Sequence, residues 1–120
     1  MKKTLLLLTI PALALGALLL QSNATSADST DMSELRILRF EADWCGPCQQ
    51  MKPVFEKVSK NFSEKADFET INVDKQPELA QQFGVRGLPT VIAIKDGKEV
   101  DRSLGYMNQV RLKGFVQKNL

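Results

Sequence analysis

Trp44-Cys45-Gly46-Pro47-Cys48 is the stretch on which the fold and the chemistry of this chain depend. It holds the only two cysteines, and it stands between an apolar run and a segment with helical periodicity. A cysteine in the first turn of a helix has a lowered pKa, because unpaired backbone N–H groups and the helix dipole stabilise its thiolate. Pro47 suits that turn, since it has a fixed φ and no N–H. The pattern therefore predicts a redox-active pair in which the helix activates Cys45.

Two other uses of a CxxC pair conflict with the composition. A structural zinc site takes four ligands, mostly cysteine and histidine, but this chain of 120 residues has two cysteines and no histidine. A purely structural disulfide between residues three apart closes a small loop, which restricts the unfolded chain little. We therefore expect no metal, and no cofactor other than the redox-active disulfide Cys45–Cys48.

The first 27 residues have the pattern of a signal peptide for export. Lys2 and Lys3 precede an uncharged apolar stretch at 4–20, and small polar residues follow it. We expect cleavage after Ala24 or after Ala27. An uncleaved membrane anchor is the alternative, because the apolar stretch is at the lower limit for spanning a bilayer. In either case we expect an exported domain, periplasmic or secreted.

The rest of the chain has the composition of one soluble domain. The whole chain is 43% apolar and 25% charged. Without the two lysines of the signal, 14 basic residues stand against 14 acidic ones, so the net charge is zero and nucleic acid is not an expected partner. We expect residues 28–33 to be a flexible lead-in and residues 34–120 to form the domain, as a monomer.

Hydrophobic periodicity predicts the order strand, helix, strand, helix, hairpin, helix. The predicted strands are 35–42, 68–73, 90–94 and 99–104, and the predicted helices are 47–62, 78–83 and 109–119. Pro53 lies inside the first helix and predicts a kink. The order predicts a parallel strand pair followed by an antiparallel pair. We therefore expect an α/β fold with a central mixed sheet of about four strands and helices on both faces.

Several motifs together resemble the thioredoxin family. They are the CxxC stretch, Pro53, Asn72-Val73-Asp74, Arg86-Gly87-Leu88-Pro89-Thr90, Asp96-Gly97 and Gly105, which fall at the family's spacing from Leu35 to Leu120. A CxxC followed about forty residues later by Gly-Leu-Pro-Thr at a strand start is far more specific than a lone CxxC. The resemblance implies a thioredoxin-like fold and a thiol–disulfide oxidoreductase.

The expected reaction is exchange with disulfide-containing protein substrates, in which Cys45 is the nucleophile and Cys48 the resolving thiol. By resemblance, Leu88–Pro89 would be a cis peptide facing the cysteines, with the backbone of Leu88 pairing with the substrate; an ordinary proline at a strand start is the alternative. Trp44 is expected to be half exposed rather than packed in the core. The residues expected to support the active site are Trp44, Gly46, Pro47 and Pro89, and those expected in the substrate groove are Gly87, Leu88 and Thr90.

The chain departs from the usual pattern of the family at its start and beside the cysteines. The family usually begins with an additional strand and helix, so this chain resembles an N-terminally trimmed core in which strand 68–73 is a sheet edge. Arg39 stands where the family has a buried acid, Thr70 where it has a lysine, and Glu41 where it commonly has an aromatic residue. Residues 39 and 41 share a strand face. One hypothesis is that they pair and that Glu41 takes part in proton transfer with Cys48; the alternative is that both reach solvent.

The direction of exchange depends on two opposing features. The Gly46-Pro47 dipeptide resembles the reducing members of the family, whereas a cation at Arg39 would stabilise thiolate and make the pair more oxidising. We expect a reductase supplied with electrons by a membrane or soluble thiol donor. A disulfide-donating or isomerase-like protein and a non-catalytic binding module are the alternatives.

Overall fold

The computed structural model describes residues 35–120, so the predictions for the signal peptide and the lead-in lie outside the described residues. The predicted order of elements is confirmed. The elements are β1 (Leu35–Glu41), α1 (Gly46–Asn61), β2 (Ala66–Asn72), α2 (Pro77–Gln82), β3 (Thr90–Lys95), β4 (Lys98–Leu104) and α3 (Gln109–Asn119). Their bounds differ from the predicted ones by at most two residues, and those of α3 are as predicted.

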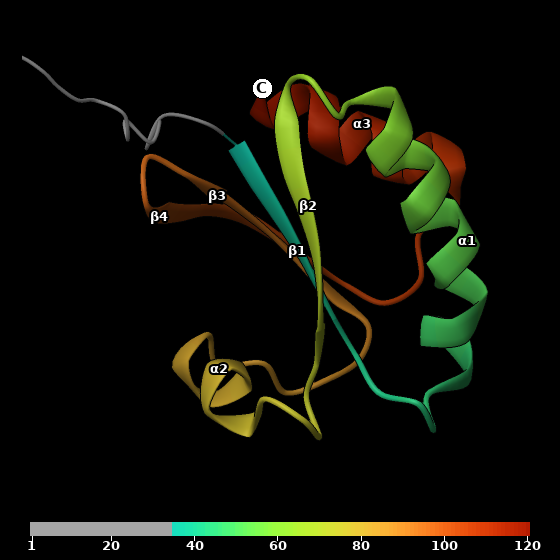
Figure 1. The fold of residues 1–120 in the computed structure, drawn as a ribbon, viewed down its shortest axis with the longest axis vertical. Helices are drawn as coiled ribbons and strands as arrows, with labels where there is room; N and C mark the ends of the chain where they lie inside the picture. Colours follow the sequence, from blue (N-terminus) through green and yellow to red (C-terminus); the bar gives the residue numbers. More distant parts are fainter. Residues whose placement is uncertain (1–34) are drawn as a thin grey trace, which may run out of the picture. The chain divides into compact units, whose positions relative to one another are not determined.

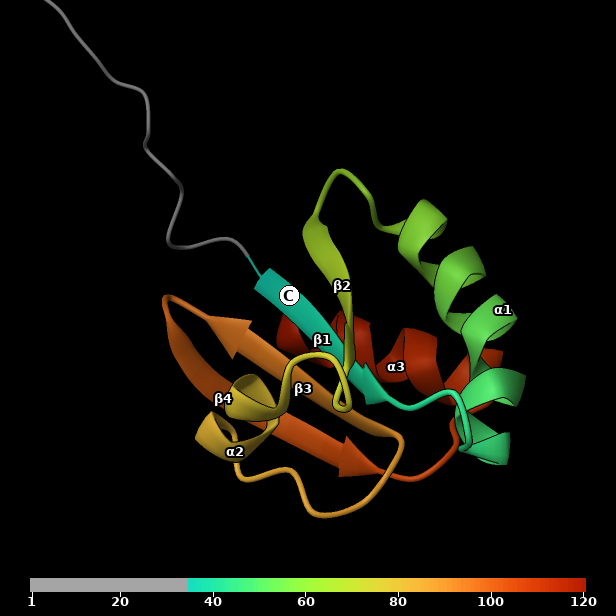
Figure 2. The same ribbon diagram turned by 60° about the horizontal axis from the view of Figure 1, so that its bottom comes forward.

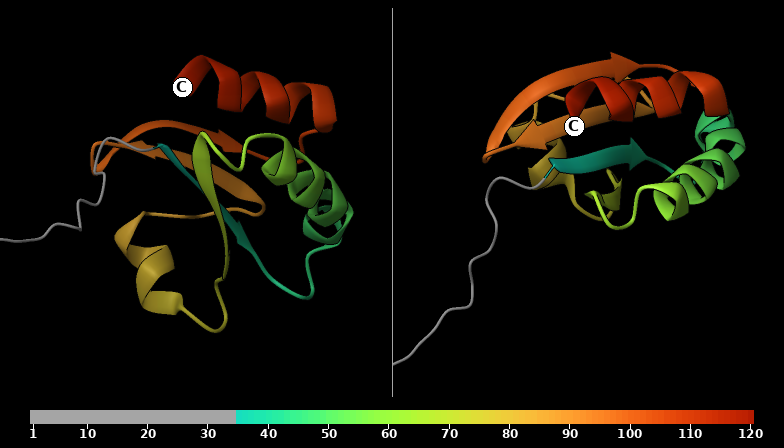
Figure 3. Two further views of the ribbon diagram at one scale, coloured as in Figure 1. Left: turned by 45° about the horizontal axis from the view of Figure 1, so that its top comes forward. Right: turned by 90° about the horizontal axis from the view of Figure 1, so that it is seen from above.

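The strands form one mixed sheet in the order β2-β1-β3-β4. β1 pairs in parallel with β2 and antiparallel with β3, and β3 pairs antiparallel with β4. Helices α1 and α3 cover one face of the sheet and α2 the other (Figures 1 and 3). The expected four-stranded mixed sheet with helices on both faces is therefore confirmed.

Alternation along β1 divides the core into two layers. Leu35 and Ile37 face α1 and α3, whereas Leu38 and Phe40 face α2. The first layer also contains Met51, Phe55, Val58, Val91, Ala93, Leu112, Phe115 and Val116. The second contains Ile71, Ile92 and Ile94, with Leu79 and Phe83 packed against them. Because β1 is covered on both faces, it holds the end that leads into the cysteines in place.

Local signals in the sequence account for the turns. Asn108 caps α3 by accepting a hydrogen bond from the backbone N–H of Arg111 over 2.9 Å. Asp96 and Gly97, with φ of 55° and 77°, make the tight turn between β3 and β4. α1 continues through Pro53 from Gly46 to Asn61. The short loop that leads to Cys45 lies between the end of β1 at Glu41 and the start of α1 at Gly46, so regular structure holds it at both ends.

β2 and β4 are the outer strands of the sheet formed by residues 35–120 (Figure 2). The edge position expected for the second strand is therefore found. Glu69 and Thr70 on β2 are exposed. No helix described for residues 35–120 has both the length and the hydropathy of a membrane-crossing segment.

Candidate active site

Cys45 and Cys48 form a disulfide at the N-terminus of α1. Cys45 is the N-cap residue, and its Sγ accepts a hydrogen bond from the Cys48 backbone N–H over 3.2 Å. Gly46 and Pro47 make up the first turn between them. Cys45 keeps 5% of its surface exposed, whereas Cys48 is completely buried. The helix position predicted for Cys45 is confirmed, and Cys45 is the more accessible sulfur.

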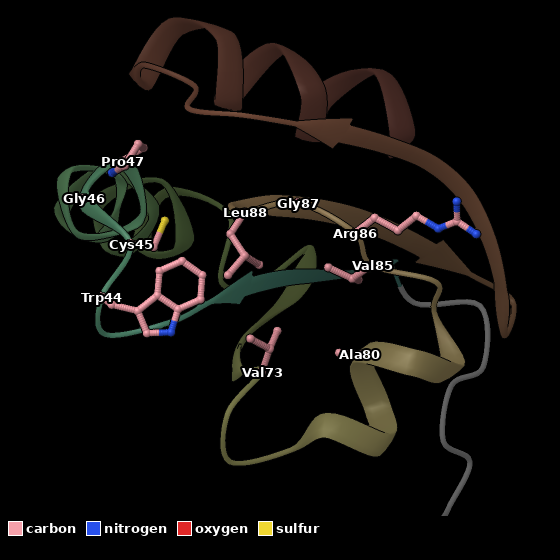
Figure 4. A pocket seen from close by; sticks show the side chains of 10 residues that line it. All are labelled: Trp44, Cys45, Gly46, Pro47, Val73, Ala80, Val85, Arg86, Gly87 and Leu88. Carbon is pink, nitrogen blue, oxygen red and sulfur yellow. The ribbon is translucent and has the colours of Figure 1, made fainter.

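An apolar groove of about 530 Å³ opens beside Cys45. Figure 4 shows the Trp44 indole, the Cys45 sulfur and the Leu88 side chain converging at one end of the groove, and the Arg86 guanidinium pointing away from that end. The complete lining is Trp44, Cys45, Gly46, Pro47, Val73, Ala80, Val85, Arg86, Gly87 and Leu88. Such a surface can receive apolar side chains that flank a substrate disulfide.

The segment before β3 forms the wall of the groove opposite Trp44. The Leu88–Pro89 peptide is cis, as the resemblance implied, and Pro89 is buried. Thr90 Oγ1 donates a hydrogen bond to the Gly87 carbonyl over 2.6 Å, and the Gly105 N–H donates one to the Pro89 carbonyl over 2.8 Å. Gly87 and Leu88 line the groove, whereas Thr90, which was also expected there, is buried and lies outside the lining.

Trp44 is 72% exposed, which is more than the half exposure expected from the sequence. Its indole is nevertheless held in place, because Nε1 donates a hydrogen bond to Asp74 Oδ2 over 2.9 Å. Sequence reasoning gave no site role to Asp74 or to the apolar lining residues Val73, Ala80 and Val85. For Asp74 and Val73 the signal was the motif Asn72-Val73-Asp74. It begins at the last residue of β2, which is parallel to β1 and so ends at the same edge of the sheet.

Arg39 and Glu41 lie beneath the active site on the face of β1 that contacts α1. Arg39 Nη1 is 2.9 Å from Glu41 Oε1, and the side chains are 2% and 13% exposed. The alternative that both residues reach solvent is therefore wrong. The guanidinium also donates to the Cys48 carbonyl and to Thr70 Oγ1, each over 3.3 Å, and lies 5.1 Å from the centre of the Phe55 ring. The aromatic ring, the ion pair and these hydrogen bonds explain how a strand interrupted by arginine stays buried.

No group of three or more Cys, Asp and Glu side chains within residues 35–120 is arranged to hold a metal ion.

The sequence profile described as Thioredoxin matches residues 19–118. The chain belongs to the thioredoxin family. It is 36% identical over 93 residues to thioredoxins of Staphylococcus haemolyticus and Staphylococcus aureus, which covers 78% of this chain and 89% of theirs. This thioredoxin is accordingly a thiol–disulfide oxidoreductase with Cys45–Cys48 as its CxxC pair.

Solved thioredoxin structures share the fold. A thioredoxin of Fasciola hepatica superposes with a TM-score of 0.69 at 35% identity, over 73% of this chain and 83% of that one. A thioredoxin of Nicotiana alata gives a TM-score of 0.70 at 37% identity, over 74% and 76% of the two chains. The thioredoxin-like α/β architecture predicted from the sequence is thus confirmed.

Proposed function

We propose that this thioredoxin reduces disulfides of proteins outside the cytoplasm. The proposal rests on the Cys45–Cys48 disulfide at the end of an apolar groove. Cys45 lines the groove, and Cys48 is buried. The N-terminal pattern of two lysines, an apolar stretch and small residues supports export.

The unequal burial of Cys45 and Cys48 supports different roles for their sulfurs. In the reduced protein, the Cys45 thiolate attacks a substrate disulfide, one substrate sulfur leaves as a thiolate, and a mixed disulfide forms. Cys48 then loses its proton and attacks Cys45 Sγ, which releases the second substrate sulfur and restores the Cys45–Cys48 disulfide. The substrate gains two electrons, and a membrane or soluble dithiol donor must return two electrons to the protein.

Substrate would lie between Trp44 and the segment 87–89. Leu88 lies two residues before the start of β3, so its backbone is outside the strand ladder and is available to an extended substrate segment. Pro89 offers no N–H, and Gly87 leaves the wall free of a side chain. Trp44 and Leu88 supply apolar contact on either side of Cys45.

A trapping experiment tests the assignment. A Cys48→Ser variant of the exported protein should accumulate mixed disulfides with protein substrates, because Cys45 attacks but nothing resolves the product. The matched Cys45→Ser variant should trap few, since its remaining sulfur is buried. Equal trapping by both variants, or by neither, would contradict the assigned roles.

The location is tested separately from the chemistry. Residues 1–33 fused to a reporter enzyme that is active only outside the cytoplasm should give activity, and a Lys2→Glu, Lys3→Glu version should give less. A reporter that remains inactive would remove export from the proposal and leave the exchange reaction untouched.

One observation favours the opposite direction of exchange as a second candidate. The buried Arg39 guanidinium donates to the Cys48 carbonyl, and a cation near the pair stabilises thiolate and therefore the reduced form. A protein whose reduced form is stabilised donates its disulfide to substrates. Reduction of insulin by the full-length chain, followed by light scattering with dithiothreitol as donor, supports the reductase, whereas oxidation of reduced ribonuclease without net insulin reduction supports the disulfide donor.

A further inference from the structure

The second step of the proposed exchange needs a proton acceptor beside Cys48. The Cys48 thiol must lose its proton as its sulfur attacks Cys45 Sγ. Cys48 is completely buried, so solvent has no direct access to it in the disulfide form. The chain has no histidine, which leaves carboxylates as the side chains suited to accept a proton near neutral pH.

Two carboxylates near the site are exposed and already accept hydrogen bonds. Asp43 Oδ1 accepts from Asn72 Nδ2 over 3.2 Å, and Asp74 Oδ2 accepts from Trp44 Nε1 over 2.9 Å. Both bonds hold loop residues on the outer side of the cysteines. Both carboxylates belong to exposed residues, whereas Cys48 is completely buried.

Glu41 differs from them in burial and in hydrogen bonding. Its side chain is only 13% exposed, and its Oε1 is buried. Arg39 Nη1 is close to this oxygen, but no donor among residues 35–120 is aligned to make a hydrogen bond with it. The carboxylate is therefore held by the charge of Arg39 rather than by an aligned hydrogen bond, and its oxygens keep lone pairs that can accept a proton.

Arg39 connects this oxygen with Cys48. A single guanidinium nitrogen, Nη1, lies 2.9 Å from Glu41 Oε1 and donates to the Cys48 carbonyl over 3.3 Å. Because one nitrogen contacts both groups, the Glu41 carboxylate lies close to the backbone of the resolving cysteine. Thr70 and the Phe55 ring hold the guanidinium from β2 and α1, which fixes its position.

We propose that Glu41 accepts the Cys48 proton as reduced substrate is released, and that Arg39 is the positioning residue that holds the carboxylate beside Cys48. The proton passes from Cys48 Sγ to Glu41, the Cys48–Cys45 bond forms, and the Cys45–substrate bond breaks, so that the substrate sulfur leaves as a thiolate and is protonated by solvent. Arg39 is the charged group in contact with Glu41. The residue that pairs with Glu41 on β2 is Asn72, which is uncharged. The inference rests on the exchange mechanism proposed above.

Dithiobisnitrobenzoate separates the two steps in one experiment. Reduced full-length protein releases one thionitrobenzoate when Cys45 attacks the reagent and a second when Cys48 resolves the mixed disulfide. For Glu41→Gln we expect the first release at the rate of the unchanged protein. The second should slow by at least about 10-fold near neutral pH. The difference should shrink as the pH rises, because a thiol that loses its proton to hydroxide no longer needs the carboxylate.

Asp43→Asn is the matched control, because it removes an exposed carboxylate two residues away and should leave both releases unchanged. A Glu41→Asp variant should release the second thionitrobenzoate faster than Glu41→Gln but more slowly than the unchanged protein, since it keeps the carboxylate on a shorter side chain. If Glu41→Gln resolves at the unchanged rate at every pH, or if Asp43→Asn slows the second release equally, the inference is overturned.

Failure of the exchange mechanism itself would look different. In that case the unchanged protein would release one thionitrobenzoate and no second, or would react first at Cys48.

Because Glu41→Gln leaves Arg39 buried without a counter-charge, the folding of this variant is checked by circular dichroism. The Arg39→Met, Glu41→Gln double variant removes both charges, and it should also show a slow second release. A double variant that resolves at the unchanged rate would equally overturn the inference.

Discussion

Trp44 Nε1 donates a hydrogen bond to Asp74 Oδ2 over 2.9 Å, although the indole is 72% exposed. An exposed aromatic side chain next to a reactive sulfur would otherwise sample several rotamers. The bond joins the loop after β1 to the loop after β2, so the parallel pairing of these strands places donor and acceptor together. One wall of the groove is therefore preorganised before substrate arrives.

Asp74→Ala should weaken substrate binding rather than the chemical step. Loss of the bond frees the indole, and a hydrogen bond of this kind contributes about 1 kcal/mol, so we expect KM for protein disulfides to rise about fivefold with kcat little changed. Trp44 is the only tryptophan, so its fluorescence anisotropy should fall at the same time. Asp74→Asn keeps an acceptor and should behave much like the unchanged protein; equal losses in both variants would show that charge rather than orientation matters.

Gly87→Ala should affect substrate entry more than stability. A Cβ at this position would lie 2.9 Å from Leu104 Cδ1, so Leu104 must move. Because Leu104 is exposed and its methyl is the end of a flexible side chain, we expect a loss below about 1 kcal/mol in the free energy of unfolding. The displaced side chain should raise KM, and a Gly87→Ala, Leu104→Ala double variant should restore the stability measured by urea unfolding.

Gly114→Ala is the control for that experiment. Gly114 lies in α3 and a Cβ there meets open space, so alanine should stabilise the helix by about 0.5–1 kcal/mol without changing KM. If Gly87→Ala has the same effects as Gly114→Ala, the contact with Leu104 has no influence on the groove.

Short-range patterns predicted most of this fold. Alternation along β1, the N-cap Asn108 and the Asp96-Gly97 turn each act over a few residues, so they are visible in the sequence. Some strand and helix ends differ from the prediction by one or two residues. The largest difference is at Ala66, which begins β2 two residues before its predicted start. The polar residue Asp67 hid this start, because an edge strand exposes side chains that a buried strand does not.

The exposure of Trp44 and the burial of Arg39 could not be predicted, because they depend on residues that are far away in the sequence. The exposure of Trp44 depends on Asp74, thirty residues along the chain. The burial of Arg39 depends on Phe55 of α1, which covers its guanidinium and so leaves its charge to pair with the neighbouring Glu41. Hydropathy alone predicts an exposed arginine. The sequence therefore could not decide between an Arg39–Glu41 pair and two side chains that reach solvent, because the choice depends on the position of α1.

Arg102→Met should make stability less dependent on pH. The hydrogen bond from Arg102 lowers the pKa of Glu99 more than burial raises it, and the positive charge adds to the lowering. A carboxyl whose pKa is lowered on folding stabilises the folded state above its ordinary value of 4.5, and that stabilisation is lost as the pH falls through the folded value. Both side chains are about one-third exposed, so screening limits the effect to below about 1 kcal/mol.

The expected result is a larger loss of unfolding free energy at about pH 7 than at about pH 3, measured by urea unfolding. Arg102 Nη2 also donates to the Phe83 carbonyl over 2.6 Å, and the loss of that bond should be the same at both pH values. Equal losses at the two pH values would show that only this backbone contact contributes.

Arg39→Met should make the Cys45–Cys48 couple more reducing. The guanidinium is buried at the Cys48 carbonyl, where its charge favours the thiolate-containing reduced form; without it the reduced form is less stable. One well-placed charge worth about 1.4 kcal/mol corresponds to about 30 mV, so we expect the potential to fall by an amount of this order. Equilibration of the full-length chain with glutathione buffers measures it.

Arg36→Met is the control for the potential, because Arg36 lies on the same strand but pairs with Glu69 at the surface. Its charge is screened by solvent, so its removal should leave the potential unchanged. If Arg39→Met also leaves it unchanged, Glu41 already cancels the charge of Arg39 at the sulfurs, and the pair acts on Cys48 only through position. If the potential rises instead, the cation must favour the disulfide, and the electrostatic case for a disulfide donor is lost.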